Sequence, residues 1–171
     1  MNIAIKYNDK EDEFSNDLNL EMRLENYIKK HFYPAKVISM LSKTYLVGGA
    51  IRDLMFAKKP KDLDFVVLGH DKEWILEVFE KFKIVPEYNR FGGYKFTYQG
   101  TTIDLWLSSD LFQAVQYNVD GLLFDVGTNS LISLTFNDFQ SNGIRLVNPE
   151  NNIDNGREKK LIKFEETFKD E

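Results

Sequence analysis

The chain has 171 residues, of which 43% are hydrophobic and 14% aromatic, enough for the core of one compact domain. Its 27 acidic residues outnumber its 22 basic residues, and this net negative charge disfavours a stand-alone protein that binds nucleic acid tightly. Cysteine is absent, which excludes disulfides, thiolate metal sites and cysteine nucleophiles.

Helices are predicted first along the chain. From Leu18 to Phe32 apolar residues recur at roughly helical intervals, and Pro34 then interrupts or restarts the helix. We interpret residues 1–43 as an N-terminal helical extension. Because no apolar run could span a bilayer and no secretory leader is present, the sequence predicts a cytoplasmic protein without a membrane partner.

A strand, a glycine turn and a helix follow. The short β-branched and apolar run 44–47 stops at Gly48-Gly49, and residues 50–55 then give a helical apolar face. After a polar break, the run 63–68 is typical of a strand buried largely on both faces. Asp71 is predicted to cap the next helix.

The second half of the chain predicts mostly strands. Alternating residues at 94–98 and 102–107 indicate a hairpin, so the sheet is expected to be mixed. Ser108 or Ser109 is predicted to cap a short helix ending near Tyr117, and two further strands are predicted at 122–126 and 131–134. A charged amphipathic helix is predicted from Asn155 to Phe168.

These elements together predict the α+β fold class, with a mixed β-sheet flanked by helices in a single domain over 1–171. Residues 44–135 form the expected catalytic core, and 136–171 are expected to supply a C-terminal strand and helix.

The first candidate for chemistry is the pair Asp62 and Asp64, because side chains two apart on a strand point to the same face. Two adjacent carboxylates repel each other unless they reach solvent, share a proton or bind a cation, and such an oxygen site suits Mg²⁺ or Mn²⁺. Taken alone, the pair is explained better by an aspartate that caps the end of the strand, since Asp is common in turns.

Asp104 is the second candidate, because it lies in an otherwise apolar strand where a charge is costly unless it faces water or a ligand. If that strand lies beside 63–67, a third carboxylate joins the cluster. Three such groups can bind two metals that assist in-line nucleotidyl transfer. The alternative is an edge strand whose polar face points outward.

The glycine pair Gly48 and Gly49 stands where a strand passes into a helix, so a ligand can approach the backbone and an anion is favoured there. Arg52 is placed to contact phosphate oxygens, and Asp53 to orient a ribose or brace Arg52. The alternative interpretation is a tight turn with a surface salt bridge.

The combination of these segments is more specific than any part. It reads Leu46-Val47-Gly48-Gly49-Ala50-Ile51-Arg52-Asp53-Leu54, followed by Lys61-Asp62-Leu63-Asp64-Phe65-Val66. It resembles the head domain of the class II CCA-adding enzymes and bacterial poly(A) polymerases, in the DNA polymerase beta-like nucleotidyltransferase superfamily. This resemblance implies that Asp62 and Asp64 ligate magnesium and that Asp104 is the third carboxylate. It also implies that Gly48, Gly49 and Arg52 cradle a triphosphate.

The resemblance extends over roughly residues 45–126. The segment 90–96 looks like the part that precedes the third carboxylate, although Gly93 stands where a threonine is usual, and it implies that Lys95 points toward the phosphates. The stretch Ser108–Ala114 departs from the family motif Arg-Asp-Phe-Thr-Ile-Asn-Ala, since its arginine and aspartate are absent. Little follows Val126 to supply the neck, body and tail domains, so template-free CCA synthesis by this chain alone is not expected.

We therefore predict a minimal Mg²⁺- or Mn²⁺-dependent nucleotidyltransferase that moves a nucleoside monophosphate from a triphosphate, ATP or CTP, to a hydroxyl. The acceptor is an RNA, a protein or a small molecule. The alternatives are a catalytically inactive nucleotide-binding or interaction module, and a subunit whose partner completes a two-component enzyme. Retention of a cluster of repelling aspartates favours catalysis.

Overall fold

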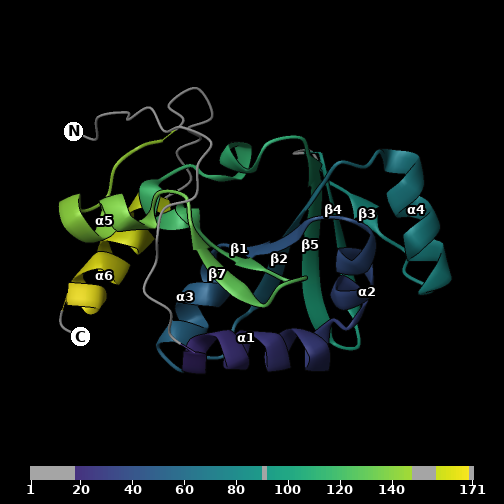
Figure 1. Ribbon diagram of the computed structural model, residues 1–171, viewed down its shortest axis with the longest axis horizontal. Helices are drawn as coiled ribbons and strands as arrows, with labels where there is room; N and C mark the ends of the chain where they lie inside the picture. Colours follow the sequence, from purple (N-terminus) through teal and green to yellow (C-terminus); the bar gives the residue numbers. More distant parts are fainter. Residues whose placement is uncertain (1–17, 90–91, 148–156, 170–171) are drawn as a thin grey trace.

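The computed structural model describes residues 18–89, 92–147 and 157–169 (Figure 1). Its strands are β1 (Thr44–Val47), β2 (Asp62–Leu68), β3 (Glu87–Tyr88), β4 (Gly93–Tyr98), β5 (Thr101–Ser108), β6 (Leu122–Asp125) and β7 (Ser130–Ser133). Its α-helices are α1 (Leu18–His31), α2 (Pro34–Leu41), α3 (Gly49–Met55), α4 (Lys72–Lys81), α5 (Phe136–Asn142) and α6 (Arg157–Lys169). Two short 3-10 helices are η1 (Leu111–Ala114) and η2 (Asn118–Gly121).

The seven strands form one sheet in the order β3-β4-β5-β2-β1-β6-β7. Strands β2 and β5 are parallel, and the other neighbouring pairs are antiparallel. The connection from β2 to β5 runs through α4 and the two strands β3 and β4. The predicted α+β class with a mixed, helix-flanked sheet is confirmed.

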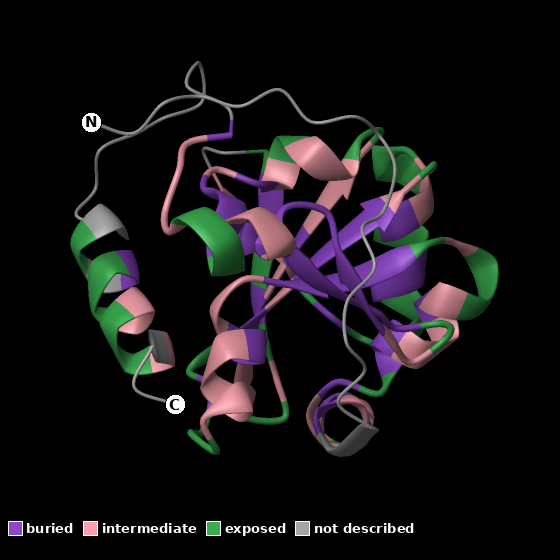
Figure 2. Cartoon of the chain, turned by 60° about the vertical axis from the view of Figure 1, so that its left-hand side comes forward, coloured by how far each residue is buried: buried purple, intermediate pink, exposed green. Residues whose placement is uncertain are grey.

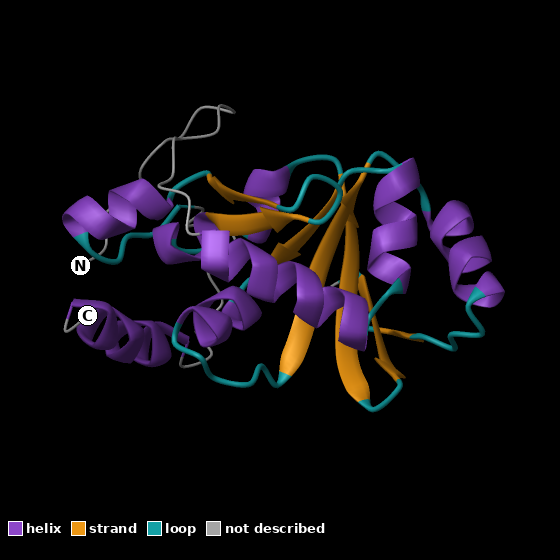
Figure 3. Ribbon diagram, turned by 60° about the horizontal axis from the view of Figure 1, so that its bottom comes forward, coloured by secondary structure: helices purple, strands orange, loops and turns teal. Residues whose placement is uncertain are grey.

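Alternating side chains divide the sheet into two faces. On one side Leu46, Phe65 and Ile103 pack in the main core with apolar residues of α1, α2, α3 and α4, and Figure 3 shows α1 lying across the strands. We call this side the helix-covered face. Figure 2 shows the buried residues concentrated in the strands and in the inner sides of the helices.

The opposite side, which we call the open face, carries a smaller apolar cluster centred on β1, β6 and β7. Its members are Tyr45, Val47, Val66, Val115, Leu123, Ile132, Leu134 and Val147. By the same alternation along β2, β5 and β4, this face also carries Asp62, Asp64, Asp104 and Lys95. The candidate site therefore lies on the face that the four helices leave uncovered.

Several local predictions are confirmed. Pro34 occupies the first turn of α2, where a missing N–H is tolerated, so the helix restarts there. Asp71 caps α4, since its carboxylate accepts a hydrogen bond from the Trp74 backbone N–H at 3.0 Å. Leu161 of α6 is 2% exposed, and Phe164 packs on Phe139 of α5, so the predicted amphipathic tail helix covers its own domain.

The prediction for the segment after β5 is wrong. Strand β5 continues to Ser108, and the segment then forms η1 and η2 in place of one helix reaching Tyr117. Asp110, not a serine, caps η1 by accepting from the Phe112 N–H at 2.9 Å. The reason is local, because the Ser108 hydroxyl accepts from the Asp110 N–H and is held in that turn.

The predicted C-terminal strand in 136–171 is present among the described residues only as an isolated bridge between Leu146 and Tyr117. Residues 136–142 form α5, so the chain leaves the sheet after β7. In the part of the chain that the structure describes, no helix is both long and apolar enough to cross a membrane.

Candidate active site

Two of the three candidate aspartates face each other across the parallel pair of strands. Asp64 of β2 is directly opposite Asp104 of β5. Asp62 lies two residues before Asp64 on the same strand and is opposite Thr102. The Asp64 and Asp104 side chains lie within hydrogen-bonding distance of each other. The geometric expectation that neighbouring strands would bring these carboxylates together is thus met.

The ionisation of Asp104 reflects this setting. Burial raises the pKa of Asp104, while the nearby Lys95 ammonium lowers it, the Asp62 charge raises it and the hydrogen bond with Asp64 lowers it. Burial prevails, and the pKa of Asp104 lies above its ordinary value. A bound cation would oppose that effect, since a positive charge favours the carboxylate.

The donor set of this cluster fits a hard cation held by few protein ligands. As the side chains stand, no group of three or more His, Asp or Glu in the described ranges is arranged to hold a metal ion. Mg²⁺, however, usually keeps several waters and binds through one or two carboxylates together with substrate phosphates. The contacting pair Asp64 and Asp104 meets that requirement, and Asp62 is exposed beside it.

Lys95 lies on β4 directly opposite Asp104, and its side chain is exposed. Because its charge acts on Asp104, it belongs to the same group of side chains. The structure therefore places Lys95 beside Asp104 and puts Asp62, Asp64 and Asp104 on one face of adjacent strands. Arg90 and Phe91, which begin the segment 90–96 that the sequence analysis related to the family, lie outside the described residues.

The glycine turn abuts the aspartates. Gly48 precedes α3 with a φ of +77°, a conformation that residues with a Cβ adopt only under strain. A Cβ at Gly48 would lie 3.2 Å from Oδ2 of Asp64, so the position also has little space for a side chain. Two independent constraints thus require glycine at this point.

Arg52 lies beside the glycine turn, since a Cβ at Gly49 would be 3.6 Å from its Nη2. Arg52 Nη1 lies 3.2 Å from Oδ1 of the buried Asp120, and its guanidinium lies 5.7 Å from the ring centroid of Phe164. Both Arg52 and Asp53 line a second cavity, between α3 and α6. Burial raises the pKa of Asp53, although Arg52 and two lysines oppose that shift. Arg52 is thus held between the glycine turn and Asp120, and Asp53 faces the second cavity.

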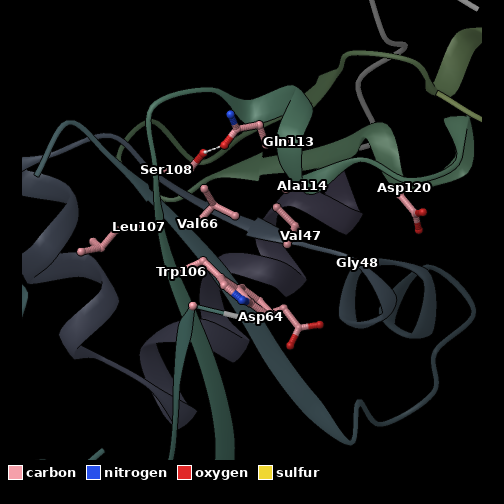
Figure 4. A pocket seen from close by; sticks show the side chains of 11 residues that line it. Val47, Gly48, Asp64, Val66, Trp106, Leu107, Ser108, Gln113, Ala114 and Asp120 are labelled. Carbon is pink, nitrogen blue, oxygen red and sulfur yellow. Dashed lines mark hydrogen bonds between the residues drawn. The ribbon is translucent and has the colours of Figure 1, made fainter. Parts of the chain in front are cut away.

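A cavity of about 460 Å³ opens beside Asp64 on the open face (Figure 4). Its lining comes from β1, the glycine turn, β2, β5 and the two 3-10 helices: Val47, Gly48, Asp64, Val66, Gly92, Trp106, Leu107, Ser108, Gln113, Ala114 and Asp120.

Of the eleven residues that line the cavity, the sequence reasoning named only Gly48 and Asp64 as site residues. Trp106 could have been found, since it follows Asp104 by two residues and therefore shares its face. Gln113 lies in the segment whose structure was predicted wrongly and Asp120 in the turn after it, and no sequence signal placed either residue here.

Comparison with known proteins identifies the fold. Residues 44–105 match the family model described as the Poly A polymerase head domain. A Thermotoga maritima CCA-adding enzyme complexed with tRNA aligns with 78% of this chain and 36% of its own, at 20% identity and a TM-score of 0.58. Comparison with curated proteins gives no match.

Two further solved structures are similar. A CCA-adding enzyme with CTP aligns with 77% of this chain and 35% of its own, at 19% identity and a TM-score of 0.57. A tRNA nucleotidyltransferase complexed with a primer tRNA and an incoming ATP analogue covers 72% and 38%, at 17% identity and a TM-score of 0.51. The chain thus spans little more than a third of the length of these enzymes, and the predicted resemblance to their head domain is confirmed.

Proposed function

We propose that this chain, which has the nucleotidyltransferase head fold, is a Mg²⁺- or Mn²⁺-dependent enzyme that transfers a nucleoside monophosphate from a triphosphate to a hydroxyl group. The observation that carries the proposal is the register of β2 and β5, which sets Asp64 against Asp104 beside the Gly48 turn. A carboxylate pair next to a half-buried glycine turn is suited to hold a cation and a triphosphate together.

The residues act by position and charge. Asp64 and Asp104 hold the cation, with Asp62 at the rim, and Lys95 offsets charge on the phosphates. The metal, when bound, lowers the pKa of the attacking hydroxyl and neutralises the triphosphate. The hydroxyl oxygen attacks the α-phosphorus, the bond to the bridging oxygen breaks and pyrophosphate leaves. The released proton passes to solvent water.

The substrates follow from charge and from the related structures. CTP and an ATP analogue are the nucleotides named with two of the similar enzymes, which supports ATP or CTP here. For the acceptor we propose a protein, a small molecule or an RNA presented by a partner, because the net charge of −5 provides no general attraction for RNA. We place the reaction in the cytoplasm.

A second candidate function is a nucleotide-binding or interaction module without turnover, alone or as a subunit completed by a partner. The ion pair between Arg52 and Asp120 favours this alternative, since it engages the side chain predicted to contact phosphate. Retention of the costly carboxylate cluster favours the enzyme.

The test is incubation with each α-labelled triphosphate and MgCl₂, comparing the wild type with Asp62→Ala/Asp64→Ala. We expect pyrophosphate release or label transfer in the wild type and a loss of about a thousandfold or more in the variant. Glu77→Gln, an exposed change on α4, is the matched control and should be as active as the wild type. Nucleotide-induced thermal stabilisation without any release would support the binding module instead.

A further inference from the structure

The cavity beside Asp64 contains an aromatic ring held in a fixed place. The indole of Trp106 on β5 lies over Gly93, its register partner on β4. A Cβ at Gly93 would lie 2.4 Å from Nε1 and 2.5 Å from Cδ1 of that indole. Glycine at this position is therefore what allows the ring to lie against the sheet, and the same ring lines the cavity.

The opposite side of the cavity carries a polar group. Figure 4 shows Gln113 and Ser108 on one side, Trp106 and Asp64 on the other, and Val47 and Val66 between them. The Ser108 hydroxyl donates to Oε1 of Gln113 at 3.1 Å, which orients the amide. The cavity thus combines an aromatic plane, apolar walls and one amide.

This combination matches the needs of a nucleobase, which has two flat aromatic faces and a hydrogen-bonding edge. Aromatic side chains stack on any base, and glutamine amides hydrogen bond to base edges. The volume of about 460 Å³ is within the range of ligand pockets. Asp64 at one end joins this space to the proposed metal and triphosphate position.

We infer that this cavity binds the base of the nucleoside triphosphate, with the indole of Trp106 stacked on the base and the amide of Gln113 hydrogen bonded to its edge. The assignment rests on the proposed function for the position of the triphosphate. It makes Trp106 the affinity determinant for the nucleoside part and Gln113 the determinant of base preference.

Tryptophan fluorescence tests the stacking directly. The chain has two tryptophans, and Trp74 stacks on His70 with ring centroids 3.7 Å apart, on α4 and away from the cavity lining. The Trp74→Phe variant therefore leaves Trp106 as the reporter. We expect nucleoside triphosphates and monophosphates to quench its emission and inorganic tripolyphosphate to leave it unchanged. Equal responses to tripolyphosphate and to nucleotides, or no response to nucleotides, would overturn the inference.

Variants separate stacking from folding. Trp106→Ala should weaken ATP binding in calorimetry about tenfold, whereas Trp106→Phe should retain most of the affinity, and neither change should affect tripolyphosphate. Gly93→Ala should act like Trp106→Ala, because the added methyl displaces the indole. Circular dichroism confirms the fold of each variant. Unchanged affinity in all three would overturn the inference.

Gln113→Ala should change the order of affinities for ATP, CTP, GTP and UTP. The matched control is Gln140→Ala, an exposed glutamine on α5 outside the cavity, which should leave that order unchanged. An unaltered order in Gln113→Ala would overturn the assignment of the base edge.

The outcomes also separate this inference from the proposed function. Quenching by monophosphates without added metal, in a protein that never releases pyrophosphate, would retain the base site and reject the transferase. Full turnover with an unchanged KM in Trp106→Ala would retain the transferase and reject the base site.

Discussion

The two faces of the sheet differ in what covers them. On the helix-covered face, Phe65 and Leu105 are fully buried beneath helices and belong to the main core. On the open face, the next residues along the same strands include Asp64 and Asp104, and the apolar cluster there is small. Because strand side chains alternate, seven residues of β2 serve both roles at once.

This difference separates stability from chemistry. Burial of apolar surface on one face stabilises the fold, and this stabilisation offsets the repulsion between the carboxylates on the other face. Substitutions on the helix-covered face should therefore change the free energy of unfolding, whereas substitutions on the open face should change ligand binding and turnover. The four predictions below test this separation, from the largest expected effect to the smallest.

Phe65→Ala should lower the free energy of unfolding by about 3–5 kcal/mol, because the ring is fully buried and packs on Phe32 with centroids 5.5 Å apart. Trp106→Ala on the open face should cost less than half as much, since that indole is only partly buried. Urea unfolding followed by circular dichroism measures both. Similar losses from the two changes would show that the open face contributes to stability as strongly as the core.

Arg52→Met should lower the free energy of unfolding by about 2–4 kcal/mol, since it removes an ion-pair partner from Asp120, which is 3% exposed. The double variant Arg52→Met/Asp120→Asn should recover part of the loss, because no charge is then left buried. Thermal and urea unfolding measure the coupling between the two sites. A double variant no more stable than the single one would contradict a stabilising role for this pair.

Gly48→Ala should lower nucleotidyl transfer about 10- to 100-fold and destabilise the fold by about 1–2 kcal/mol. Its positive φ strains any Cβ, and that Cβ would also press on Oδ2 of Asp64. Gly69→Ala is the matched control, with a φ of +83° but no atom within 4 Å of the added Cβ. The control should lose stability without losing turnover, and equal activity of the two variants would refute the contact with Asp64.

Asp104→Asn should raise the melting temperature in EDTA at pH 7 by about 1–2 °C. The folded protein raises the pKa of Asp104 above its ordinary 3.8, so it holds this proton more tightly than the unfolded chain does. Stability from this group is present at low pH and is lost as the pH rises through the raised pKa.

Calorimetry from low pH to neutral pH should therefore show a smaller decrease in melting temperature for Asp104→Asn than for the wild type. Mg²⁺ should stabilise the wild type more than the variant, because the carboxylate pair is intact only there. A melting temperature that is lower in Asp104→Asn than in the wild type at neutral pH would contradict a raised pKa of Asp104 in the folded protein.

The sequence by itself determined the features that depend on local spacing. Apolar runs and period-two alternation located every strand of the sheet except β3, and the spacing of Asp62 and Asp64 set them on one side of β2. The break at Pro34 separated α1 from α2, and Gly48 marked the turn. The motif from Leu46 to Val66 was specific enough to indicate the head fold, which the family model and the solved structures confirm. The catalytic roles of these residues stay predictions.

Only the tertiary structure decided which distant groups meet. The parallel register of β2 and β5 set Asp64 against Asp104, Arg52 paired with Asp120 68 residues away, and the indole of Trp106 lay over Gly93. Side-chain periodicity is a property of a few consecutive residues, so it can be read from the sequence. Strand register and long-range ion pairs depend instead on how separate segments pack, and no local pattern specifies that packing.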